Sequence, residues 1–289
     1  MAKIFITGAA GGFGLPTALA LLDKGHAVAG SVRHRSGKNA SIAATLESAG
    51  AHLVEMDVTD SASTDLGVAK AVTLLGGLDV LFNNAGIGAY GIQELMSADE
   101  MARVFDVNVM GVQRVMRAAL PHLREQGRGT VIYTSSLIGR IAMPFYGTYS
   151  ASKWALEAIA ECYRTELSGF GIESCIVEPG AMPTAFFEGM VTPDDPARET
   201  QYGEFAQVPG VSAQGLAQML ESIPAQRPQR ISEAVVALLD MPFGKKPFRM
   251  VVDHTGVGPE IERYNRALHD VTHTVMKNFG IEQMLTLNA

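Results

Sequence analysis

Tyr149 and Lys153 form the pair of side chains in this sequence best suited to acid–base chemistry. They stand four residues apart in a segment predicted to be helical, so both side chains lie on one face. A free phenol titrates near pH 10, and a neighbouring ammonium group lowers that pKa because it stabilises the phenolate. Tyrosine can then exchange a proton near neutral pH. An accidental surface pair is the alternative, disfavoured because Lys153 is the only lysine between Lys70 and Lys245.

A serine pair, Ser135-Ser136, stands where an apolar run predicted to be a strand ends, thirteen residues before Tyr149. Ligands bind at the carboxyl ends of parallel strands, so the Ser136 hydroxyl is a candidate to hydrogen-bond a substrate oxygen. The alternative is an ordinary strand-end turn. A serine hydrolase is disfavoured because no G-x-S-x-G elbow surrounds either serine.

A glycine-rich turn, TGAAGGFG at residues 7–14, joins the first predicted strand to the first predicted helix. Glycine permits positive φ and lets the backbone approach a ligand, and the helix N-terminus that follows offers free N–H groups to a phosphate. The pyrophosphate of a dinucleotide is the expected ligand. The alternative is a glycine-rich loop without a ligand.

The segment after the second predicted strand, GSVRHRS at residues 30–36, bears on the choice between NAD and NADP. It contains no acidic residue, whereas NAD enzymes place one there to bind the ribose 2′-hydroxyl. Arg33 and Arg35 can pair with a 2′-phosphate, and Ser31 can donate a hydrogen bond. The arginines could also simply be solvated. The segment favours NADP(H), and NAD(H) stays open.

The elements that must position these residues follow from an alternation of apolar runs and helical patterns through the first 180 residues. This alternation predicts helical crossovers between parallel strands, and therefore an α/β fold. We expect strands at residues 3–6, 27–32, 52–55, 79–83, 130–135, 172–178 and 248–252. We expect helices at residues 15–24, 39–49, 61–75, 98–126, 146–170 and 232–240. The fourth of these helices begins at a capping box formed by Ser97 and Glu100.

The last hundred residues are less regular. Residues 181–230 contain six prolines and no clear period, which predicts an irregular lid over a substrate site. A disordered insert is the alternative, disfavoured by apolar anchors such as Phe186 and Leu216. Apolar residues between 261 and 275 predict an amphipathic helix in the tail, residues 254–289. No repeat or linker divides the chain, so residues 1–289 are expected to form one domain, with the cofactor-binding and catalytic core at 1–180.

Composition limits the class of partner. A net charge of −7 without a basic stripe argues against binding nucleic acid. Cys162 and Cys175 form neither a disulfide framework nor a metal-ligand set, so no metal is expected. The sequence has no signal-peptide core and no apolar run long enough to span a membrane. We therefore expect a cytoplasmic protein that acts on a small molecule.

Six signals together resemble the ordinary, non-extended branch of the short-chain dehydrogenase/reductase family, over about residues 3–184. They are the glycine turn, Asn83-Asn84-Ala85-Gly86, Asn108, Ser136, Tyr149-x-x-x-Lys153 and Pro179-Gly180. The resemblance implies a Rossmann-type doubly wound parallel sheet of about seven strands in the order 3-2-1-4-5-6-7. The lid and helical tail are similar to those of 17β-hydroxysteroid and retinol dehydrogenase-like members. The tail after about Val252 is longer than in the minimal member.

The resemblance also implies catalytic roles. Tyr149 would be the general acid in reduction and the base in oxidation, and Lys153 would lower its pKa and bind the nicotinamide ribose. Ser136 would hold and polarise the substrate oxygen. Asn108 would distort its helix and help a water molecule link Lys153 to solvent; a polar residue on an exposed helix face is the alternative.

The same resemblance implies a set of cofactor contacts. Asn83 and Gly86 would brace the sheet and line the adenosine side, Asp57 would meet the adenine amino group, and Thr184 would bind the carboxamide. The other expected contacts are Gly8, Gly12, Phe13, Gly14, Ser31, Arg33, Val58, Asn84, Ala85, Pro179 and Gly180.

The expected reaction interconverts a carbonyl and an alcohol by direct hydride transfer. An apolar substrate is favoured by Ile138, Met143, Phe145, Met182, Phe186, Phe187 and Met190, although any one of them could be plain core. A sugar-nucleotide epimerase or dehydratase is a rival, disfavoured by the glycine spacing. An NADPH-binding regulator without turnover is another, disfavoured by the intact set of Ser136, Tyr149 and Lys153. Family members commonly pair through the two long helices, which implies a homodimer or homotetramer.

Overall fold

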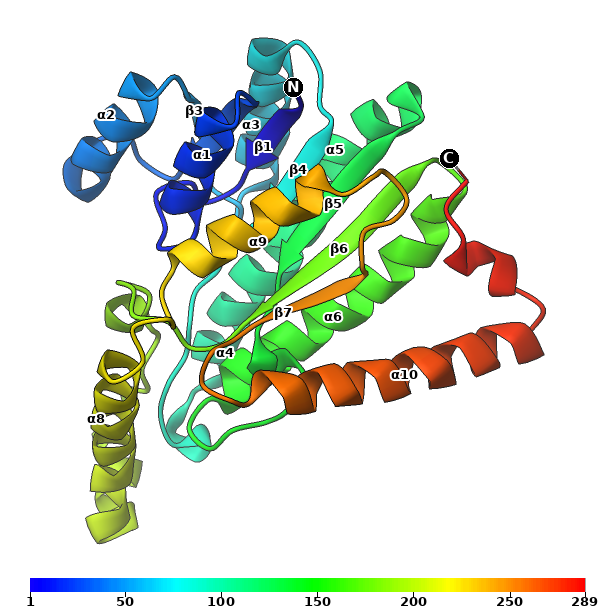
Figure 1. The fold of residues 1–289 in the computed structure, drawn as a ribbon. Coiled ribbons are helices and arrows are strands. Elements are labelled where there is room, and N and C mark those ends of the chain that lie inside the picture. The colour runs from blue at the N-terminus through cyan, green and yellow to red at the C-terminus, as the bar shows by residue number, and fades with distance from the viewer. Residues whose placement is uncertain (289) are drawn as a thin grey trace.

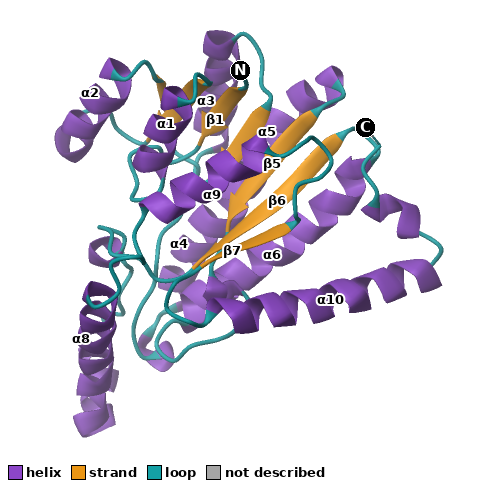
Figure 2. Cartoon of the chain, in the orientation of Figure 1, coloured by secondary structure: helices purple, strands orange, loops and turns teal. Residues whose placement is uncertain are grey.

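A seven-stranded parallel sheet forms the centre of the computed structural model, which describes residues 1–288 (Figures 1 and 2). The strands lie in the order β3-β2-β1-β4-β5-β6-β7, and every neighbouring pair is parallel. They are β1 (Lys3–Ile6), β2 (Ala27–Val32), β3 (His52–Glu55), β4 (Val80–Asn83), β5 (Gly129–Thr134), β6 (Ile172–Pro179) and β7 (Arg249–Val252). The predicted fold and strand order are confirmed, and each strand begins and ends within one residue of its expected position.

Helices cover both faces of this sheet (Figure 1). One face packs against α1 (Gly14–Asp23), α2 (Ala40–Ser48) and α9 (Gln229–Asp240). The other packs against α3 (Ser61–Leu75), α5 (Gly111–Gln126) and α6 (Gly147–Ser168). With both faces covered, the central strands are apolar along most of their length rather than alternating with polar residues.

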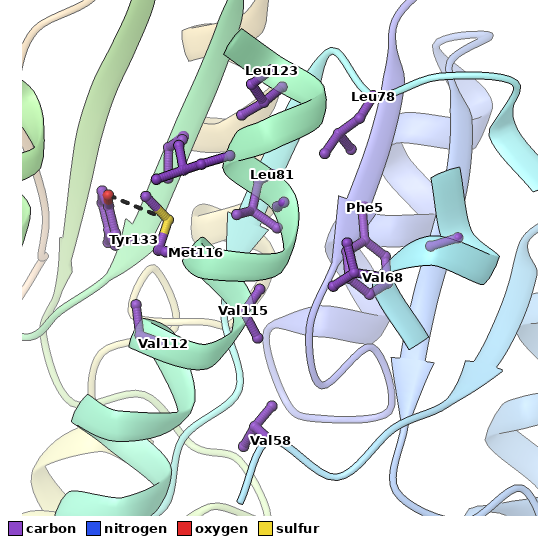
Figure 3. Packing of buried hydrophobic residues seen from close by; sticks show 14 of the residues in the cluster. Phe5, Val58, Val68, Leu78, Leu81, Val112, Val115, Met116, Leu123 and Tyr133 are labelled. Carbon is purple, nitrogen blue, oxygen red and sulfur yellow. Dashed lines mark hydrogen bonds between the residues drawn. The ribbon is translucent and has the colours of Figure 1, made fainter. Parts of the chain in front are cut away.

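The core between the sheet and α5 is tightly interdigitated (Figure 3). The side chains of Phe5, Leu81 and Met116 are fully buried there. Tyr133 on β5 is buried too, and its hydroxyl donates a hydrogen bond to the Met116 sulfur, 3.6 Å away. Burial raises the pKa of Tyr133 well above its usual value, so this phenol stays neutral. Its position in the core separates it from the tyrosine proposed for chemistry.

The expected helix at residues 98–126 is interrupted. It begins at the predicted capping box, where the Ser97 hydroxyl accepts a hydrogen bond from the Glu100 amide and the Glu100 carboxylate accepts one from the Ser97 amide. α4 (Ala98–Phe105) then gives way to a π turn, η3 (Asp106–Met110), before α5 continues the run. Asn108 lies inside that π turn, where the family resemblance implied a local distortion.

The lid segment is more regular than predicted. Residues 181–230 contain α8 (Val208–Glu221), a helix of 14 residues with Pro209 in its first turn, where proline is tolerated. Proline count alone therefore misled the prediction. α8 extends away from the body of the molecule, and most of its residues are exposed (Figure 1). The shorter elements of the chain are η1 (Gly37–Asn39), η2 (Gln93–Leu95), η4 (Leu137–Gly139), η5 (Phe187–Gly189), α7 (Pro196–Glu199) and η6 (Thr200–Gln207).

The predicted helical tail forms α10 (Gly258–Asn278), which begins beside β7, and a last turn, η7 (Glu282–Leu285), which packs on α6. Ala289, the final residue of the expected tail, lies outside the described residues. Within residues 1–288, none of the helices combines the length and the apolar character that crossing a bilayer requires.

Candidate active site

A cavity of about 650 Å³ opens at the carboxyl ends of the central strands. It runs from the glycine turn after β1, past the ends of β2, β4, β5 and β6, to the lid. The strand order reverses between β1 and β4, and ligands bind at such a switch point in open α/β sheets. The structure brings nearly all of the predicted site residues to the wall of this one cavity. They are Gly8, Gly12, Phe13, Ser31, Arg33, Asp57, Val58, Asn84, Ala85, Gly86, Ser136, Tyr149, Lys153, Pro179, Gly180 and Thr184.

The glycine turn is shaped for close approach. Gly8 has φ +66°, and a Cβ atom there would lie 3.0 Å from the Ala85 Cα. A Cβ on Gly12 would lie 2.7 Å from the Thr184 Cβ, and one on Gly14 would lie 2.3 Å from the Gly8 carbonyl oxygen. Gly14 does not line the cavity; it lets the first turn of α1 pack on the loop. The glycine turn therefore has the backbone shape that a pyrophosphate needs, and its residues fit a dinucleotide.

Hydrogen bonds fix this turn against the loop after β4. The Thr7 hydroxyl accepts from the backbone amides of Asn84 (2.9 Å) and Ala85 (3.0 Å). The Asn84 side chain donates to the carbonyls of Thr7 and Gly8. Asn83, which we expected on the adenosine side, does not line the cavity. It is buried at the end of β4, where its amide donates to the Met116 sulfur 3.5 Å away, so this expectation was wrong.

The two candidate arginines have different surroundings at the end of the cavity where the adenosine is expected. Arg33 is exposed and lines the cavity, whereas Arg35 pairs with Glu47 on α2. Burial alone would raise the pKa of Asp57, but hydrogen bonds from Thr59 and the charge of Arg33 hold it below its usual value. Asp57 is thus an ionised acceptor beside the exposed guanidinium of Arg33, a pattern suited to an adenosine with a nearby phosphate.

Ser136, Tyr149 and Lys153 come together where β5 ends. Ser136 is the N-cap residue of η4, and its hydroxyl accepts a hydrogen bond from the Ile138 amide at 3.4 Å. Tyr149 and Lys153 occupy successive turns of α6 and are 8% and 4% exposed. The Lys153 ammonium lies 5.7 Å from the centre of the Tyr149 ring and donates to the Thr134 carbonyl at 2.7 Å. Hydroxyl, phenol and ammonium therefore share one wall.

The pKa values of Tyr149 and Lys153 differ from those that the sequence predicted. Burial raises the pKa of Tyr149 above its usual value, and a hydrogen bond with Ser136 lowers it only in part. Burial lowers the pKa of Lys153 to about 8, against the opposing charge of Glu157. The predicted lowering of the Tyr149 pKa is not found, because burial, which disfavours the charged phenolate, is the largest influence on it.

Asn108 is buried, not exposed. Its side-chain amide donates to the Ile87 carbonyl (2.9 Å) and the Ser152 hydroxyl (3.0 Å), and its oxygen accepts from the Ile87 amide (2.9 Å). A Cβ on Gly86 would lie 3.2 Å from the Asn108 oxygen and 3.6 Å from the Lys153 ammonium. Glycine at position 86 thus keeps open the space between these two polar groups, although Asn108 does not itself line the cavity. The exposed-helix alternative is excluded.

The far end of the cavity is apolar. Six of the seven side chains expected there do line it: Ile138, Met143, Met182, Phe186, Phe187 and Met190. Phe145 does not; its ring packs against Tyr90 and Phe205, with centroids 6.0 Å and 6.1 Å away. The sequence prediction missed Ile141, Leu216, Met219 and Val257. Leu216 and Met219 stand three residues apart on α8, so recognising that helix would have revealed them.

Asp253 is a charged residue of the wall that the prediction also missed. Its carboxylate accepts hydrogen bonds from the amides of Thr255 (3.1 Å), Val257 (3.1 Å) and Gly258 (3.0 Å) and so caps α10. Gln226 donates to the same carboxylate and to the Ala181 carbonyl. This pair ties the tail to the loop that begins at Gly180, and no motif in the sequence marks it.

A family profile described as short chain dehydrogenase matches residues 2–194, more than half of the chain. The chain therefore belongs to the short-chain dehydrogenase family, as the sequence motifs indicated. It is 37% identical over 183 residues to 3-ketodihydrosphingosine reductase of Bacteroides thetaiotaomicron, covering 63% of this chain and 65% of that protein. It is 34% identical over 190 residues to 17-beta-hydroxysteroid dehydrogenase type 1 of Homo sapiens, covering 65% of this chain and 57% of that protein. These matches span less than two thirds of either relative.

A solved structure resembles the larger part of the chain. It is an alcohol dehydrogenase from the archaeon Thermococcus sibiricus complexed with 5-hydroxy-NADP, with a TM-score of 0.68 and 27% identity. The similarity covers 86% of this chain and 94% of that one. The family profile thus places the chain among the short-chain dehydrogenases, and this solved relative carries bound 5-hydroxy-NADP.

Proposed function

We propose that this chain is an NADP(H)-dependent oxidoreductase that interconverts a carbonyl and an alcohol by direct hydride transfer, with Tyr149 as the proton donor and acceptor. One observation carries the proposal: Ser136, Tyr149 and Lys153 line the same cavity as the glycine turn. A regulator without turnover has no need of these three groups together. The glycine spacing T-G-x-x-x-G-x-G also disfavours the epimerase rival.

The residues of the chain divide the work along the cavity. The glycine turn and Arg33 hold the phosphates, Asp57 meets the adenine, and the loop through Gly180 and Thr184 holds the nicotinamide end. When bound, the dinucleotide supplies or accepts the hydride. Ser136 and Tyr149 direct their hydroxyls at the substrate oxygen, where negative charge develops during reduction.

The protonation states of Tyr149 and Lys153 determine how the proton is transferred. Because burial raises the pKa of Tyr149, the phenol holds its proton at neutral pH and can deliver it to the substrate oxygen. Lys153, whose pKa lies at about 8, is mostly an ammonium group at pH 7 and stabilises the phenolate that remains. The same groups run in reverse during oxidation.

NADP(H) is preferred in this proposal because Arg33 has no ion-pair partner among the residues that the structure describes, whereas Arg35 pairs with Glu47. An exposed guanidinium at the ribose end can pair with a 2′-phosphate. The absence of any acidic residue from residues 30–36 removes the repulsion that a 2′-phosphate would meet there.

An apolar substrate fits the far end of the cavity. Its wall is formed by Ile138, Phe186 and Met190 with Leu216 and Met219 of α8, and the carboxylate of Asp253 is already saturated by hydrogen bonds. Two relatives are named for a ketodihydrosphingosine and a hydroxysteroid, both largely apolar molecules. We expect ketones, aldehydes or secondary alcohols with an extended apolar part.

The test is NADPH and NADH oxidation measured side by side against a panel of apolar and polar carbonyls. Tyr149→Phe should lower kcat by about 10²–10⁴-fold, because general acid catalysis contributes that much, while NADPH still binds. Tyr163→Phe is the matched control: this tyrosine is on the same helix and bonds to Gln113, away from the cavity. Unchanged turnover in the Tyr149→Phe enzyme would refute the assignment, and cofactor binding without turnover on any carbonyl would favour the regulator.

We also propose a homodimer formed through α5 and α6. Met110, just before α5, and Trp154, on α6, are large apolar side chains with 50% and 41% exposure. Burial of such side chains between two copies removes apolar surface from water. Size-exclusion chromatography with light scattering should give twice the monomer mass, and Trp154→Glu should shift it toward the monomer. A wild-type monomer at micromolar concentration would contradict this.

A further inference from the structure

A buried charge cluster lies behind the catalytic wall. It consists of Arg140 after η4, Glu157 on α6, Glu178 on β6, Arg249 on β7 and Asn265 on α10. The side chains of Glu157 and Glu178 are 1% and 0% exposed, and those of Arg140 and Arg249 are 4% and 9% exposed. Four ionisable side chains held this far from water need a reason beyond stability, because apolar substitutes often serve stability as well.

Glu157 is the member of the cluster that lies on the same helix as Tyr149 and Lys153. It follows Lys153 by four residues on α6, so the two side chains lie on the same face of the helix. Both are buried, and the charge of Glu157 is the one contribution that raises the pKa of Lys153 against desolvation. One Glu157 oxygen accepts from Arg249 at 2.9 Å, while the other, Oε1, has no hydrogen-bond partner among the described residues. A carboxylate left partly unpaired in the interior keeps a strong field around it.

The loop that carries Ser136 packs against Lys153. A Cβ on Gly139 would lie 3.2 Å from the Lys153 Cβ, so η4 rests directly against the lysine. The next residue, Arg140, reaches Glu157 at 3.6 Å and Glu178 at 3.8 Å. The cluster therefore touches both the helix that holds Lys153 and the turn that holds Ser136.

We propose that Glu157 is a positioning residue that keeps Lys153 in its ammonium form at the Thr134 carbonyl, and so sets the pH range of the proton transfer assigned to Tyr149. This inference rests on the proposed function for its consequence in catalysis. Its physical content, the charge state of one lysine, is independent of turnover.

Other ionisable groups surround Glu157 on its own helix and on the neighbouring elements. On α6 they are Lys153, Glu161 and Arg164; from η4, β6 and β7 they are Arg140, Glu178 and Arg249. Asn265 contributes a neutral amide from α10. Arg140 and Arg249 partly offset Glu157, and the neighbouring charge that raises the pKa of Lys153 is that of Glu157. Removal of Glu157 should therefore lower the pKa of Lys153 further, in the direction that burial already favours.

The experiment follows the Lys153 side chain directly, in the full chain without ligand, by NMR of ¹³Cε-labelled lysine. Lys153→Arg identifies the signal. In the wild type it should titrate near pH 8. In Glu157→Gln the midpoint should fall by about one pH unit, the size of effect expected for one nearby charge inside a protein. Glu161→Gln is the matched control: it lies one turn further on, also pairs with Arg249, and its side chain is 33% exposed. Its midpoint should not move.

A second variant removes the risk that Glu157→Gln leaves Arg249 unpaired and unfolds the chain. Glu157→Met with Arg249→Met deletes both charges of the pair and keeps similar volume. Arg140 keeps Glu178 as a partner, and Glu161, which also loses Arg249, is 33% exposed to water. The Lys153 midpoint should still fall, because only Glu157 acts on it. The proposal is overturned if the midpoint in both Glu157 variants coincides with that of the wild type.

The kinetic readout separates this inference from the proposed function. We expect kcat/KM for NADPH-dependent reduction, measured with the best carbonyl of the panel, to fall at high pH. In Glu157→Gln this fall should begin at a lower pH than in the wild type, and in Glu161→Gln it should begin at the wild-type pH. If Lys153→Met keeps full turnover, the proposed function fails whatever the NMR shows. If Lys153→Met is inactive and the Glu157 variants shift neither the NMR midpoint nor the pH at which kcat/KM falls, the proposed function stands and the role of Glu157 fails.

Discussion

Ser31 illustrates how single residues around the cavity are held in place by the protein itself. Its hydroxyl accepts a hydrogen bond from the Gly8 amide at 3.1 Å, which joins the end of β2 to the glycine turn. Asp57 is fixed in the same way by the amide and hydroxyl of Thr59, 2.9 Å and 2.7 Å away. Side chains ordered in advance lose little freedom when a ligand binds. Arg33 is the exception at this end of the cavity, because it is exposed.

Arg33→Ala should weaken the binding of NADPH and leave the binding of NADH nearly unchanged. A charge-assisted hydrogen bond contributes about 1.5–3 kcal/mol, so the Kd for NADPH should rise about ten- to a hundredfold. Fluorescence titration with each nucleotide measures both values. Arg35→Ala is the control, since that guanidinium pairs with Glu47. Equal losses of NADPH and NADH affinity in Arg33→Ala would show that the residue does not read the 2′-phosphate.

At the scale of the element, the π turn between α4 and α5 is the feature that shapes the site. One extra residue in the helical repeat turns Asn108 inward, where it bonds both backbone groups of Ile87 and the Ser152 hydroxyl. The loop after β4 and the face of α6 are thereby joined through one side chain. Such turns are uncommon in helices and concentrate at functional sites.

Asn108→Ala should destabilise the fold by about 2–4 kcal/mol, because it leaves the Ile87 amide and carbonyl without partners in the interior. It should also lower kcat, since Ser152 and the loop at Gly86 lose the group that fixes them beside Lys153. Urea unfolding and steady-state kinetics measure the two effects. Met116→Ala, in the core on α5, is a control of similar destabilisation away from the cavity. If both variants lose the same fraction of kcat, Asn108 serves stability alone.

The parts of the fold and the site that could be predicted from the sequence are those that depend on contacts between residues close together in the chain. Strands and the capping box at Ser97 were predictable because period and local hydrogen bonds decide them. The glycine turn and the Tyr149–Lys153 spacing are local motifs, and apart from Gly14 the residues predicted from them do line the cavity. The ring of Phe145 and the amide of Asn83 were misplaced because their direction depends on packing with distant segments. α8 was missed because the prolines of residues 181–230 masked a helix that tolerates one of them, Pro209, in its first turn.

At the scale of the whole molecule, the buried charge cluster joins elements far apart in the chain. Asn265 on α10 donates to Glu178 at 2.5 Å and accepts from Arg140 at 3.1 Å, and Arg249 lies 3.5 Å from Glu178. The tail is thus bound to the sheet through polar contacts rather than through an apolar face alone. Those contacts make the stability of the molecule depend on pH through Glu178.

Burial and the neighbouring charge of Glu157 raise the pKa of Glu178 to about 8, against an ordinary value of about 4.5. Between these values the folded chain holds a proton that the unfolded chain has released, so the unfolded state binds fewer protons. The free energy of unfolding must therefore fall as the pH rises from about 4.5 to about 8, and the contribution is complete only below that window.

Glu178→Gln should flatten this part of the profile, since a neutral amide has no proton to lose. Urea unfolding at intervals from pH 5 to pH 8.5 gives the slope for each protein. The difference in stability between variant and wild type should move in favour of the variant as the pH rises. Glu166→Gln, at an exposed position on α6, is the control and should keep the wild-type slope. Parallel profiles for Glu178→Gln and wild type would mean that Glu178 is ionised throughout, with Arg249 and Arg140 compensating its burial in full.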